Sequence, residues 1–310
     1  MTRDHRPALL LVVGPTGSGK TEIAHEVALV AKGEVVSADA FAVYRGMDIG
    51  TAKPSPELRR EVRYHMLDVA EPEEPFSAGR FAAEARAAVA GVLERGALPI
   101  VIGGSGFYVA ALLDGLPPGP ARSESLRSGL ADWASRRGSQ AAHRFLAVND
   151  PAAASRIPVG NLKYTLRALE ILLLTGSPAS CRLPASDPWG RSFRIVRLGL
   201  RRAPAQLHVR IEDRVRRMLD SGWGEEVRQL IERGLKSDSN SFQAIGYREV
   251  AEWILGQISR AEAEERIVSA TRALAKRQRT WLGRESSIQW VAPEEAVARA
   301  FALLADMETQ

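Results

Sequence analysis

Apolar residues in the first part of the chain alternate between short continuous runs and helical stripes. Ala8–Val13 is continuously apolar and ends in glycine-rich sequence, which is typical of a buried parallel strand. The same reasoning predicts further strands at Glu34–Ala38, Tyr64–Val69 and Leu98–Ile102. Helices are predicted between them, at Thr21–Ala31 and Phe81–Glu94, because their apolar residues recur at helical spacing. This repeated order of strand and helix favours an α/β fold with a parallel sheet.

The pattern changes at Pro117–Pro120 and again at the breaker-rich stretch Pro184–Gly190. Between them the sequence is helical without a clear strand, so we expect a mostly helical insertion at 118–192 within a core formed by 1–117 and 193–310. The later elements expected in the core are a strand at Arg194–Leu200, amphipathic helices around Leu207–Leu219 and Ile267–Trp281, a strand at Ser287–Val291 and a helix at Pro293–Met307.

Composition excludes several classes of protein. The chain has 310 residues, of which 45% are hydrophobic and 25% charged, as in ordinary globular proteins. Its longest clean apolar run, Ala8–Val13, is far shorter than the ~20 residues of a membrane span. The single cysteine, Cys181, excludes an internal disulfide and a zinc site built of cysteines alone, and it favours a reducing cytoplasm.

The charge balance is mildly basic, with 42 Lys and Arg against 37 Asp and Glu. Nearly all of the basic residues are arginine, which suits bidentate contacts to phosphate. A codon bias of a GC-rich genome explains the same excess. None of the five histidines shows the spacing of a metal-binding helix, and no zinc is assigned.

The strongest motif follows the first predicted strand. Gly14-Pro15-Thr16-Gly17-Ser18-Gly19-Lys20-Thr21 fits the phosphate-binding pattern G-x-x-x-x-G-K-[ST], with a strand before it and a helix after it. Glycines let backbone N–H groups approach a phosphate chain, Lys20 neutralises its charge, and the Thr21 hydroxyl suits Mg²⁺. The motif therefore predicts a P-loop fold that binds a polyphosphate or diphosphate.

An acidic residue ends the second predicted strand rather than the fourth. Asp39 follows Glu34–Ala38, and the carboxyl ends of parallel strands face the ligand crevice, so Asp39 is expected near the phosphate loop. Its position alone fits a turn or helix-cap role equally well.

Several longer strings resemble the tRNA dimethylallyltransferases, also called tRNA isopentenyltransferases, of the bacterial type without a zinc finger. Ser37–Pro54 is similar to the signature of that family, and the phosphate loop is similar to its P-loop. Further similar segments, in the same order, are Tyr64–Val69, Leu98–Tyr108, Arg167–Glu170, Gln243–Tyr247 and Thr271–Trp281. The resemblance extends from residue 9 to about residue 290.

The resemblance implies transfer of a dimethylallyl group from its diphosphate to N6 of the adenosine 3′-adjacent to the tRNA anticodon, at position 37. The implied partners are dimethylallyl diphosphate and the anticodon stem-loop, the cofactor is Mg²⁺ held by Thr21, and the protein is expected to be a monomer away from membranes. The implied catalytic residues are Asp39 as base, Lys20, Thr21 and Arg210, although Arg210 also fits a solvated helix face. The diphosphate site would be Gly14, Pro15, Thr16, Gly17, Ser18, Gly19, Lys20 and Thr21. The implied tRNA contacts are Asp39, Ala40, Phe41, Ala42, Ser105, Arg127, Phe242, Gln243, Ala244, Ile245, Gly246, Tyr247, Lys276 and Arg277.

Other functions remain open. A small-molecule P-loop kinase shares the loop, an isopentenyltransferase for free adenine nucleotides shares the loop and Asp39, and a non-catalytic RNA-binding module is a poorer fit. The basic stripe Arg272, Lys276 and Arg279 fits an RNA-facing helix or a solvated face. Val159–Tyr164 departs from the family, which commonly has an Asn-Asp pair and an arginine there; Lys163 is a candidate substitute.

Overall fold

The computed structural model describes residues 4–117, 119–120, 123–182 and 188–309. Contacts divide the chain into two units. One unit contains 1–113 and 189–310, and the other contains 114–188. The boundaries expected from the sequence, 117/118 and 192/193, lie a few residues after those of the structure, 113/114 and 188/189. Pro118 and most of the breaker-rich stretch, residues 184–187, lie outside the described residues.

The first unit is built on a parallel sheet of six strands, in the order β3-β2-β4-β1-β5-β6. The strands are β1 (Ala8–Val13), β2 (Glu34–Ser37), β3 (Tyr64–His65), β4 (Pro99–Gly103), β5 (Arg194–Leu200) and β6 (Gln289–Val291). The predicted class, a P-loop-like α/β fold, is confirmed. Because β1, β2 and β4 are neighbours and parallel, the loops that follow them meet at one edge of the sheet.

One predicted strand is much shorter than expected. The run Tyr64–Val69 forms a strand only over Tyr64–His65. Met66 and Asp68 have φ angles of 61° and 56°, in the left-handed region, so the backbone leaves the extended conformation immediately. Within this run only Met66 is buried, and the sequence pattern did not reveal these turns.

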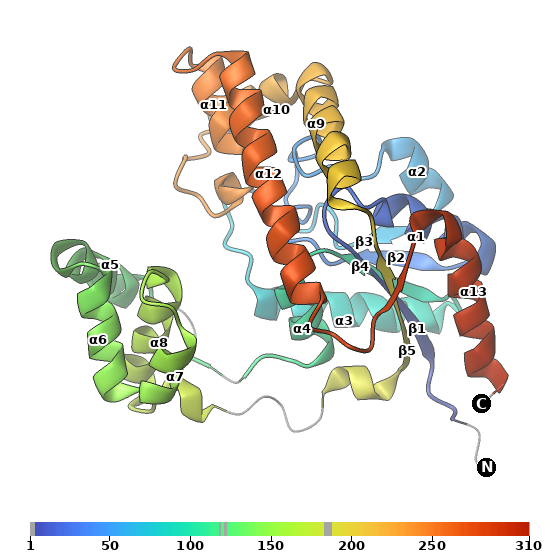
Figure 1. Ribbon diagram of the computed structural model, residues 1–310, viewed down its shortest axis with the longest axis horizontal. Helices are drawn as coiled ribbons and strands as arrows, with labels where there is room; N and C mark the ends of the chain where they lie inside the picture. The colour runs from blue at the N-terminus through green and yellow to red at the C-terminus, as the bar shows by residue number, and fades with distance from the viewer. Residues whose placement is uncertain (1–3, 118, 121–122, 183–187, 310) are drawn as a thin grey trace. The chain divides into compact units, whose positions relative to one another are not determined.

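Helices cover both faces of the sheet (Figure 1). In the first unit they are α1 (Lys20–Ala31), α2 (Pro56–Glu61), α3 (Ala78–Glu94), α4 (Gly106–Leu113), α9 (Pro204–Asp220), α10 (Trp223–Glu232), α11 (Tyr247–Ile254), α12 (Arg260–Leu282) and α13 (Pro293–Thr309), with 3₁₀ turns η2 (Trp189–Ser192) and η3 (Ser241–Gln243). Along β1, Leu10 and Val12 face α1 and α13, whereas Leu9, Leu11 and Val13 belong to the core on the opposite face. The continuous apolar run of β1 is explained by this burial on both faces.

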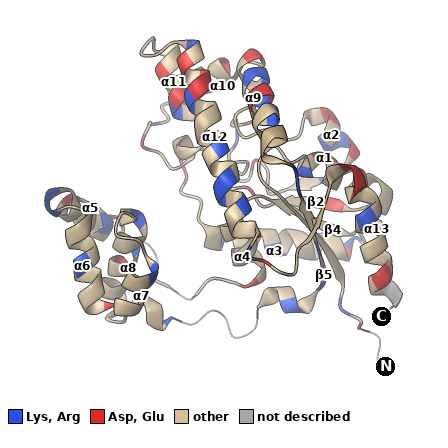
Figure 2. Ribbon diagram, viewed as in Figure 1, with Lys and Arg blue, Asp and Glu red and all other residues tan. Residues whose placement is uncertain are grey.

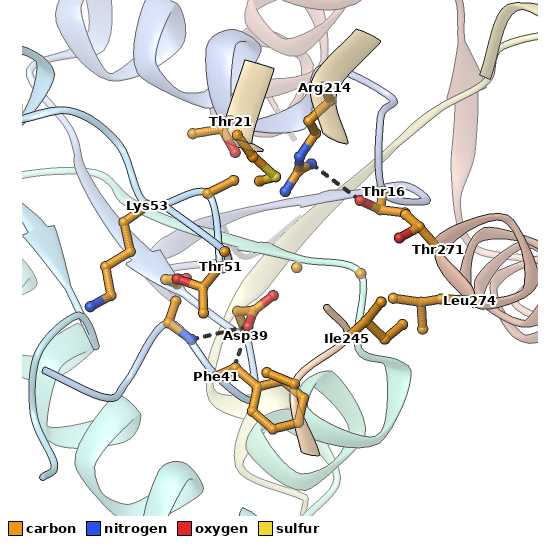
Figure 3. A pocket seen from close by; sticks show the side chains of 18 of the residues that line it. Thr16, Thr21, Asp39, Phe41, Thr51, Lys53, Arg214, Ile245, Thr271 and Leu274 are labelled. Atoms are coloured by element: carbon orange, nitrogen blue, oxygen red, sulfur yellow. Dashed lines mark hydrogen bonds between the residues drawn. The ribbon is translucent and has the colours of Figure 1, made fainter. Parts of the chain in front are cut away.

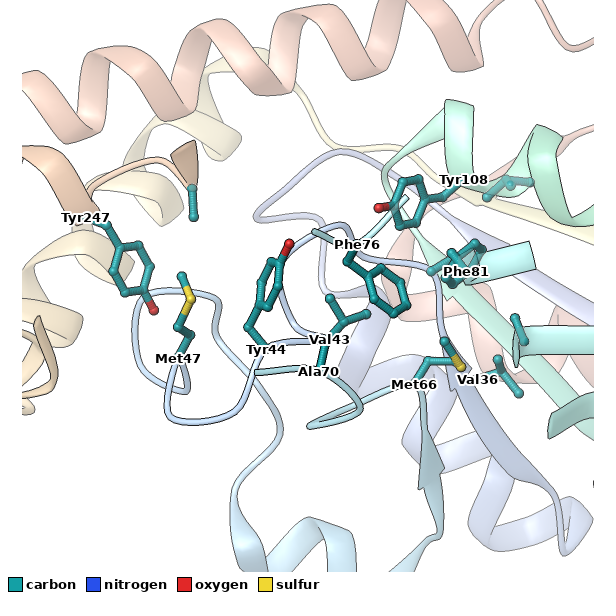
Figure 4. Packing of buried hydrophobic residues seen from close by; sticks show 14 of the residues in the cluster. Val36, Val43, Tyr44, Met47, Met66, Ala70, Phe76, Phe81, Tyr108 and Tyr247 are labelled. Atoms are coloured by element: carbon teal, nitrogen blue, oxygen red, sulfur yellow. The ribbon is translucent and has the colours of Figure 1, made fainter. Parts of the chain in front are cut away.

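The larger core continues beyond the sheet. Figure 4 shows it running from Val36 and Phe81 through Tyr44 and Met47 to Tyr247. The segment after β2 is therefore packed into the core rather than hanging from it, which fixes the loop that carries Asp39.

The second unit is helical in the part that the structure describes. It contains α5 (Glu124–Arg137), α6 (Ser139–Asn149), α7 (Pro151–Arg156), α8 (Leu162–Thr175) and η1 (Ala179–Cys181). It has its own small core, which includes Leu130, Leu146 and Leu169. Over the described ranges of the whole chain, none of the helices has the length and apolarity needed to cross a membrane.

Candidate active site

The phosphate loop joins β1 to α1. Gly17 and Gly19 have φ angles of 81° and 97°, a conformation that favours glycine and turns the backbone into α1. Gly19 is the N-cap of α1, and no side chain caps its first N–H groups. A helix N-terminus with free N–H groups is a ready anion site. Lys20 and Thr21 are the first residues of this helix, so their side chains start at that site.

A pocket of about 350 Å³ opens beside this loop (Figure 3). Its polar side is formed by Thr16, Lys20, Thr21, Asp39 and Arg214. Its other walls come from residues 50–54, the end of β4, α9, the start of α10, the segment after η3, and α12. The residues that form its apolar wall are Val215, Met218, Trp223, Ala244, Ile245, Ile267 and Leu274. Polar and apolar walls in one cavity suit a ligand with an anionic head and a hydrocarbon part.

Asp39 lines this pocket and also organises a turn. Its Oδ1 atom accepts hydrogen bonds from the backbone N–H groups of Phe41 (2.9 Å) and Ala42 (3.1 Å). Both bonds use the same oxygen, so the turn fixes the carboxylate while Oδ2 takes no part in it. The turn role that the sequence left open is therefore present, and the same residue also lines the pocket.

Cations gather around the phosphate loop. Nη1 of Arg214 donates to the Thr16 hydroxyl at 3.2 Å, and Nε of Arg210 donates to the Gly17 carbonyl at 2.9 Å. Burial and the nearby Arg214 lower the pKa of Lys20 to about 8, despite the opposing charges of Asp39 and Glu22. Burial also lowers the pKa of Arg214. Cations kept this close together are stabilised when an anion binds between them.

The structure brings ten of the predicted site residues to the pocket, and the others lie outside its lining. Thr16, Lys20, Thr21, Asp39, Phe41, Ala42, Gln243, Ala244, Ile245 and Arg277 line it. Gly14, Pro15, Gly17, Ser18 and Gly19 complete the phosphate loop without lining the pocket, and Ala40, Ser105, Gly246 and Lys276 are also outside its lining. Phe242 and Tyr247 are buried in the core and contact each other edge-on. Arg127 belongs to the second unit, where it lies 3.6 Å from Glu170.

Arg210 and Arg214 differ in their placement. Arg210 is exposed and outside the lining, whereas Arg214, one helical turn later, lines the pocket. One feature of the sequence points to Arg214: it lies four residues after Arg210, and residues four apart share a helix face.

Comparison with known proteins shows the family of this chain. The model of the family described as IPP transferase matches residues 42–285. The chain belongs to the IPP transferase family. A tRNA dimethylallyltransferase of Geobacter metallireducens is 41% identical over 291 residues, which cover 94% of each chain. Another, from Thermomicrobium roseum, is 42% identical over 92% of this chain and 86% of its own. The crystal structure of the tRNA isopentenylpyrophosphate transferase of Bacillus halodurans is 34% identical, has a TM-score of 0.71, and covers 98% of this chain and 97% of that one. The family resemblance of the sequence is confirmed.

In this IPP transferase, Lys53 fastens the signature segment internally. Its side chain is only 1% exposed, and Nζ donates to the Tyr44 carbonyl (2.6 Å), Asp48 (2.7 Å) and Asp68 (2.5 Å). Tyr44 and Asp48 belong to the signature segment Ser37–Pro54, and Asp68 belongs to the segment after β3. Lys53 therefore holds this part of the pocket wall in place.

Glu226 fastens the same segment from outside. Its carboxylate accepts from the backbone N–H groups of Asp48 (2.7 Å), Ile49 (2.6 Å) and Gly50 (3.2 Å), and from the Tyr247 hydroxyl (2.7 Å). Burial and this carboxylate raise the pKa of Tyr247 well above its usual range, so the hydroxyl remains a donor. Glu226 thus connects α10 to two motifs that are far apart in sequence.

Sequence reasoning missed Glu226, and Gln278 received no role in it. The Oε1 atom of Gln278 accepts from the Thr16 N–H at 2.8 Å, which joins α12 to the phosphate loop. Gln278 lies beside the predicted contact Arg277, but nothing in the local pattern marks either contact. Both depend on segments that meet only in the folded chain.

Proposed function

We propose that this protein transfers a dimethylallyl group from dimethylallyl diphosphate to N6 of the adenosine at position 37 of tRNA, 3′-adjacent to the anticodon, and releases diphosphate. The observation that carries the proposal is the pocket itself. It contains a phosphate loop with Lys20 and Arg214 at one side, a fixed carboxylate at Asp39, and an apolar wall. The family membership supports the same reaction.

The phosphate loop would bind the diphosphate. The free N–H groups of α1, Lys20 and Arg214 supply positive charge where the leaving group gains negative charge. Arg210, which holds the Gly17 carbonyl, would keep the loop in position or add charge at its rim. Stabilising the leaving group in this way speeds the breaking of the allylic C–O bond.

Asp39 would act as the base. The N6 lone pair attacks the allylic carbon, the C–O electron pair leaves with the diphosphate, and the N6 proton moves to Asp39. Oδ2 is the oxygen suited to this step, because Oδ1 is bonded to the Phe41 and Ala42 amides. The turn thereby orients the base without using both of its oxygens.

Mg²⁺ fits the donors present, and we propose it as the cofactor. In the part of the chain that the structure describes, no cluster of three His, Cys, Asp or Glu side chains suits a metal ion. The Thr21 hydroxyl lines the pocket, and Mg²⁺ takes few protein ligands beside phosphate oxygens and water. Held by Thr21 and the substrate, Mg²⁺ would neutralise diphosphate charge.

The acceptor would reach the pocket as an extruded base. Phe41 and Ile245 line the cavity and offer apolar surface to an adenine ring. Figure 2 shows Lys and Arg along the half of α12 that ends at Leu282, where Lys276 and Arg277 are exposed. Phosphate contacts from this half of α12 would hold the RNA backbone beside the pocket.

The helical second unit would make a further tRNA contact. Lys163 and Tyr164 are exposed at the start of α8, within the segment that departs from the family pattern. A cation and an aromatic ring suit a phosphate and an unstacked base, respectively. We place the reaction in the cytoplasm and expect a monomer.

A labelled-transfer assay tests the proposal. Purified protein is mixed with Mg²⁺, labelled dimethylallyl diphosphate and unmodified tRNA that has an adenosine 3′ of its anticodon, with AMP and ATP as parallel acceptors. Label on tRNA alone supports the proposal. Label on a free nucleotide would assign the chain to nucleotide prenylation, and ATP consumption without any label would indicate a kinase.

A further inference from the structure

Helix α9 runs past the phosphate loop and contributes Arg214, Val215 and Met218 to the pocket lining. Near the start of the helix Arg210 contacts Gly17, and one turn later Arg214 contacts Thr16. Met218 lies a further turn along and lines the pocket. Four residues advance a helix by about 6 Å, so Met218 is about that far beyond the arginine that marks the diphosphate end.

Trp223, five residues after Met218, also lines the pocket, and its indole lies directly against two glycines. Trp223 is 1% exposed and lines the pocket. A Cβ added to Gly50 would lie 2.3 Å from Trp223 Nε1, and one added to Gly246 would lie 2.0 Å from its Cη2. Both glycine backbones thus lie against the indole, which has no room to move toward either of them.

Glu226 locks this arrangement. It is three residues after Trp223 on α10, and it accepts hydrogen bonds from the amides of residues 48–50 and from the Tyr247 hydroxyl. Tyr247 follows Gly246 directly. One carboxylate therefore holds both glycine segments against Trp223. We call Met218, Trp223 and Gly50, with Glu226 behind them, the end wall.

We infer that the end wall sets the upper size of the prenyl donor, so that the pocket accepts a five-carbon allylic diphosphate and rejects a ten-carbon one. This inference rests on the proposed function. With its diphosphate at the phosphate loop, the hydrocarbon part of the donor extends along α9 toward Met218. A second isoprene unit would need the space that Met218 and Trp223 occupy, and the held indole does not yield that space.

The central test compares two donors in one assay. For the purified protein and for Met218→Ala, kcat/KM is measured with dimethylallyl diphosphate and with geranyl diphosphate, using the same tRNA. Removing the Met218 side chain opens space one turn from Arg214. We expect the ratio of geranyl to dimethylallyl kcat/KM to rise by about 10-fold or more, the usual value of a few methylene groups in an apolar pocket.

Two further variants separate size selection from general damage. Met218→Trp narrows the pocket and should raise the KM for dimethylallyl diphosphate, and Glu226→Gln should relax the end wall and raise the geranyl ratio. Val209→Ala, at an exposed site on the same helix, is the matched control and should leave the ratio unchanged. Affinity for inorganic pyrophosphate, measured calorimetrically, should stay the same in the Met218 variants because pyrophosphate occupies only the phosphate loop.

Different results would contradict the end wall as the size limit and the proposed transfer function. An unchanged donor ratio in Met218→Ala, with normal pyrophosphate affinity and normal dimethylallyl transfer, would overturn the end wall as the size limit. Efficient use of geranyl diphosphate by the unaltered protein would overturn it as well. Absence of dimethylallyl transfer to tRNA by the unaltered protein would instead overturn the proposed function.

Discussion

Thr16 accepts a hydrogen bond from Arg214 through its hydroxyl, at 3.2 Å, and this bond joins the phosphate loop to α9 inside the pocket. The Thr16 amide is bonded to Gln278 on α12. The loop is therefore attached to both α9 and α12. Its shape depends on residues distant in sequence as well as on its own glycines.

Arg214→Met is expected to weaken pyrophosphate binding by about 10- to 100-fold, since a hydrogen bond to a charged group contributes about 1.5–3 kcal/mol. Arg210→Met should weaken it less, because Arg210 is exposed and its charge is screened by solvent. Calorimetric titration of both variants with pyrophosphate checks this. Equal losses would show that both arginines contact the diphosphate.

Pyrophosphate affinity should decrease as the pH rises through about 8. Burial and Arg214 lower the pKa of free Lys20 to about 8, whereas a bound anion favours the charged amine and raises that pKa. Above pH 8, binding must therefore recharge Lys20, at a cost of up to tenfold in affinity per pH unit. Lys20→Arg stays charged over this range and is the control. The same pH profile in both proteins would contradict the assignment.

Asp39→Asn should lower the transfer rate by about 10²- to 10⁴-fold, as expected for loss of a general base. The Asn Oδ1 atom can still accept from the Phe41 and Ala42 amides, so the turn should persist. Pyrophosphate affinity should not fall in this variant. Single-turnover rates with saturating tRNA test the prediction, and near-normal rates would remove Asp39 as the base.

Glu170 should control the stability of the second unit. Its side chain is fully buried, and it accepts from Arg167 at 2.7 Å and from the Ser123 amide at 3.0 Å. Although burial alone would raise it, these bonds lower the pKa of Glu170. Glu170→Ala should cost about 1–3 kcal/mol, because it removes charged hydrogen bonds to Arg167 and the Ser123 amide. Hydrogen exchange of α5 and α8 measures this, and Glu124→Ala, at a largely exposed site, is the control.

Acid should have a related effect on the same helices. A carboxyl group whose pKa is lower in the folded state stabilises that state above its unfolded pKa, about 4.3 for Glu. The stabilisation is lost as the pH falls through the folded value. Protection of α5 and α8 should therefore decline below about pH 4, and this decline should be smaller in Glu170→Gln.

Local pattern was enough to predict the sheet and the phosphate loop. The apolar run of β1 and the glycines after it are neighbours in sequence, so burial, turn and anion site are all encoded locally. Asp39 was found for a similar reason, because the end of a parallel strand fixes where the next residue lies. The shortened β3 was not predicted, because Met66 and Asp68 have positive φ angles although neither is glycine, the residue that usually indicates such a conformation.

Contacts between distant segments were not predictable in this way. Glu226 lies on an ordinary amphipathic helix, and only the folded chain brings it to the amides of residues 48–50. The surroundings of Trp223 were not predictable for the same reason. They are formed by Gly50 and Gly246, which are about 200 residues apart in sequence. The residues that form such a contact can be identified only in the folded structure, because nothing in the sequence near each of them marks it.

The strand order has a consequence for how the chain acquires its structure during synthesis. β1 lies between β4 and β5, but β5 is made only after the whole helical second unit. Until then β1 is an edge strand with unpaired backbone groups, which invites pairing with other chains. The second unit has a core of its own and can fold before β5 is synthesised and completes the sheet. A nascent chain that stops before Arg194 would therefore contain a folded helical unit and an incomplete sheet, with the aggregation-prone strand β1 at the open edge of that sheet.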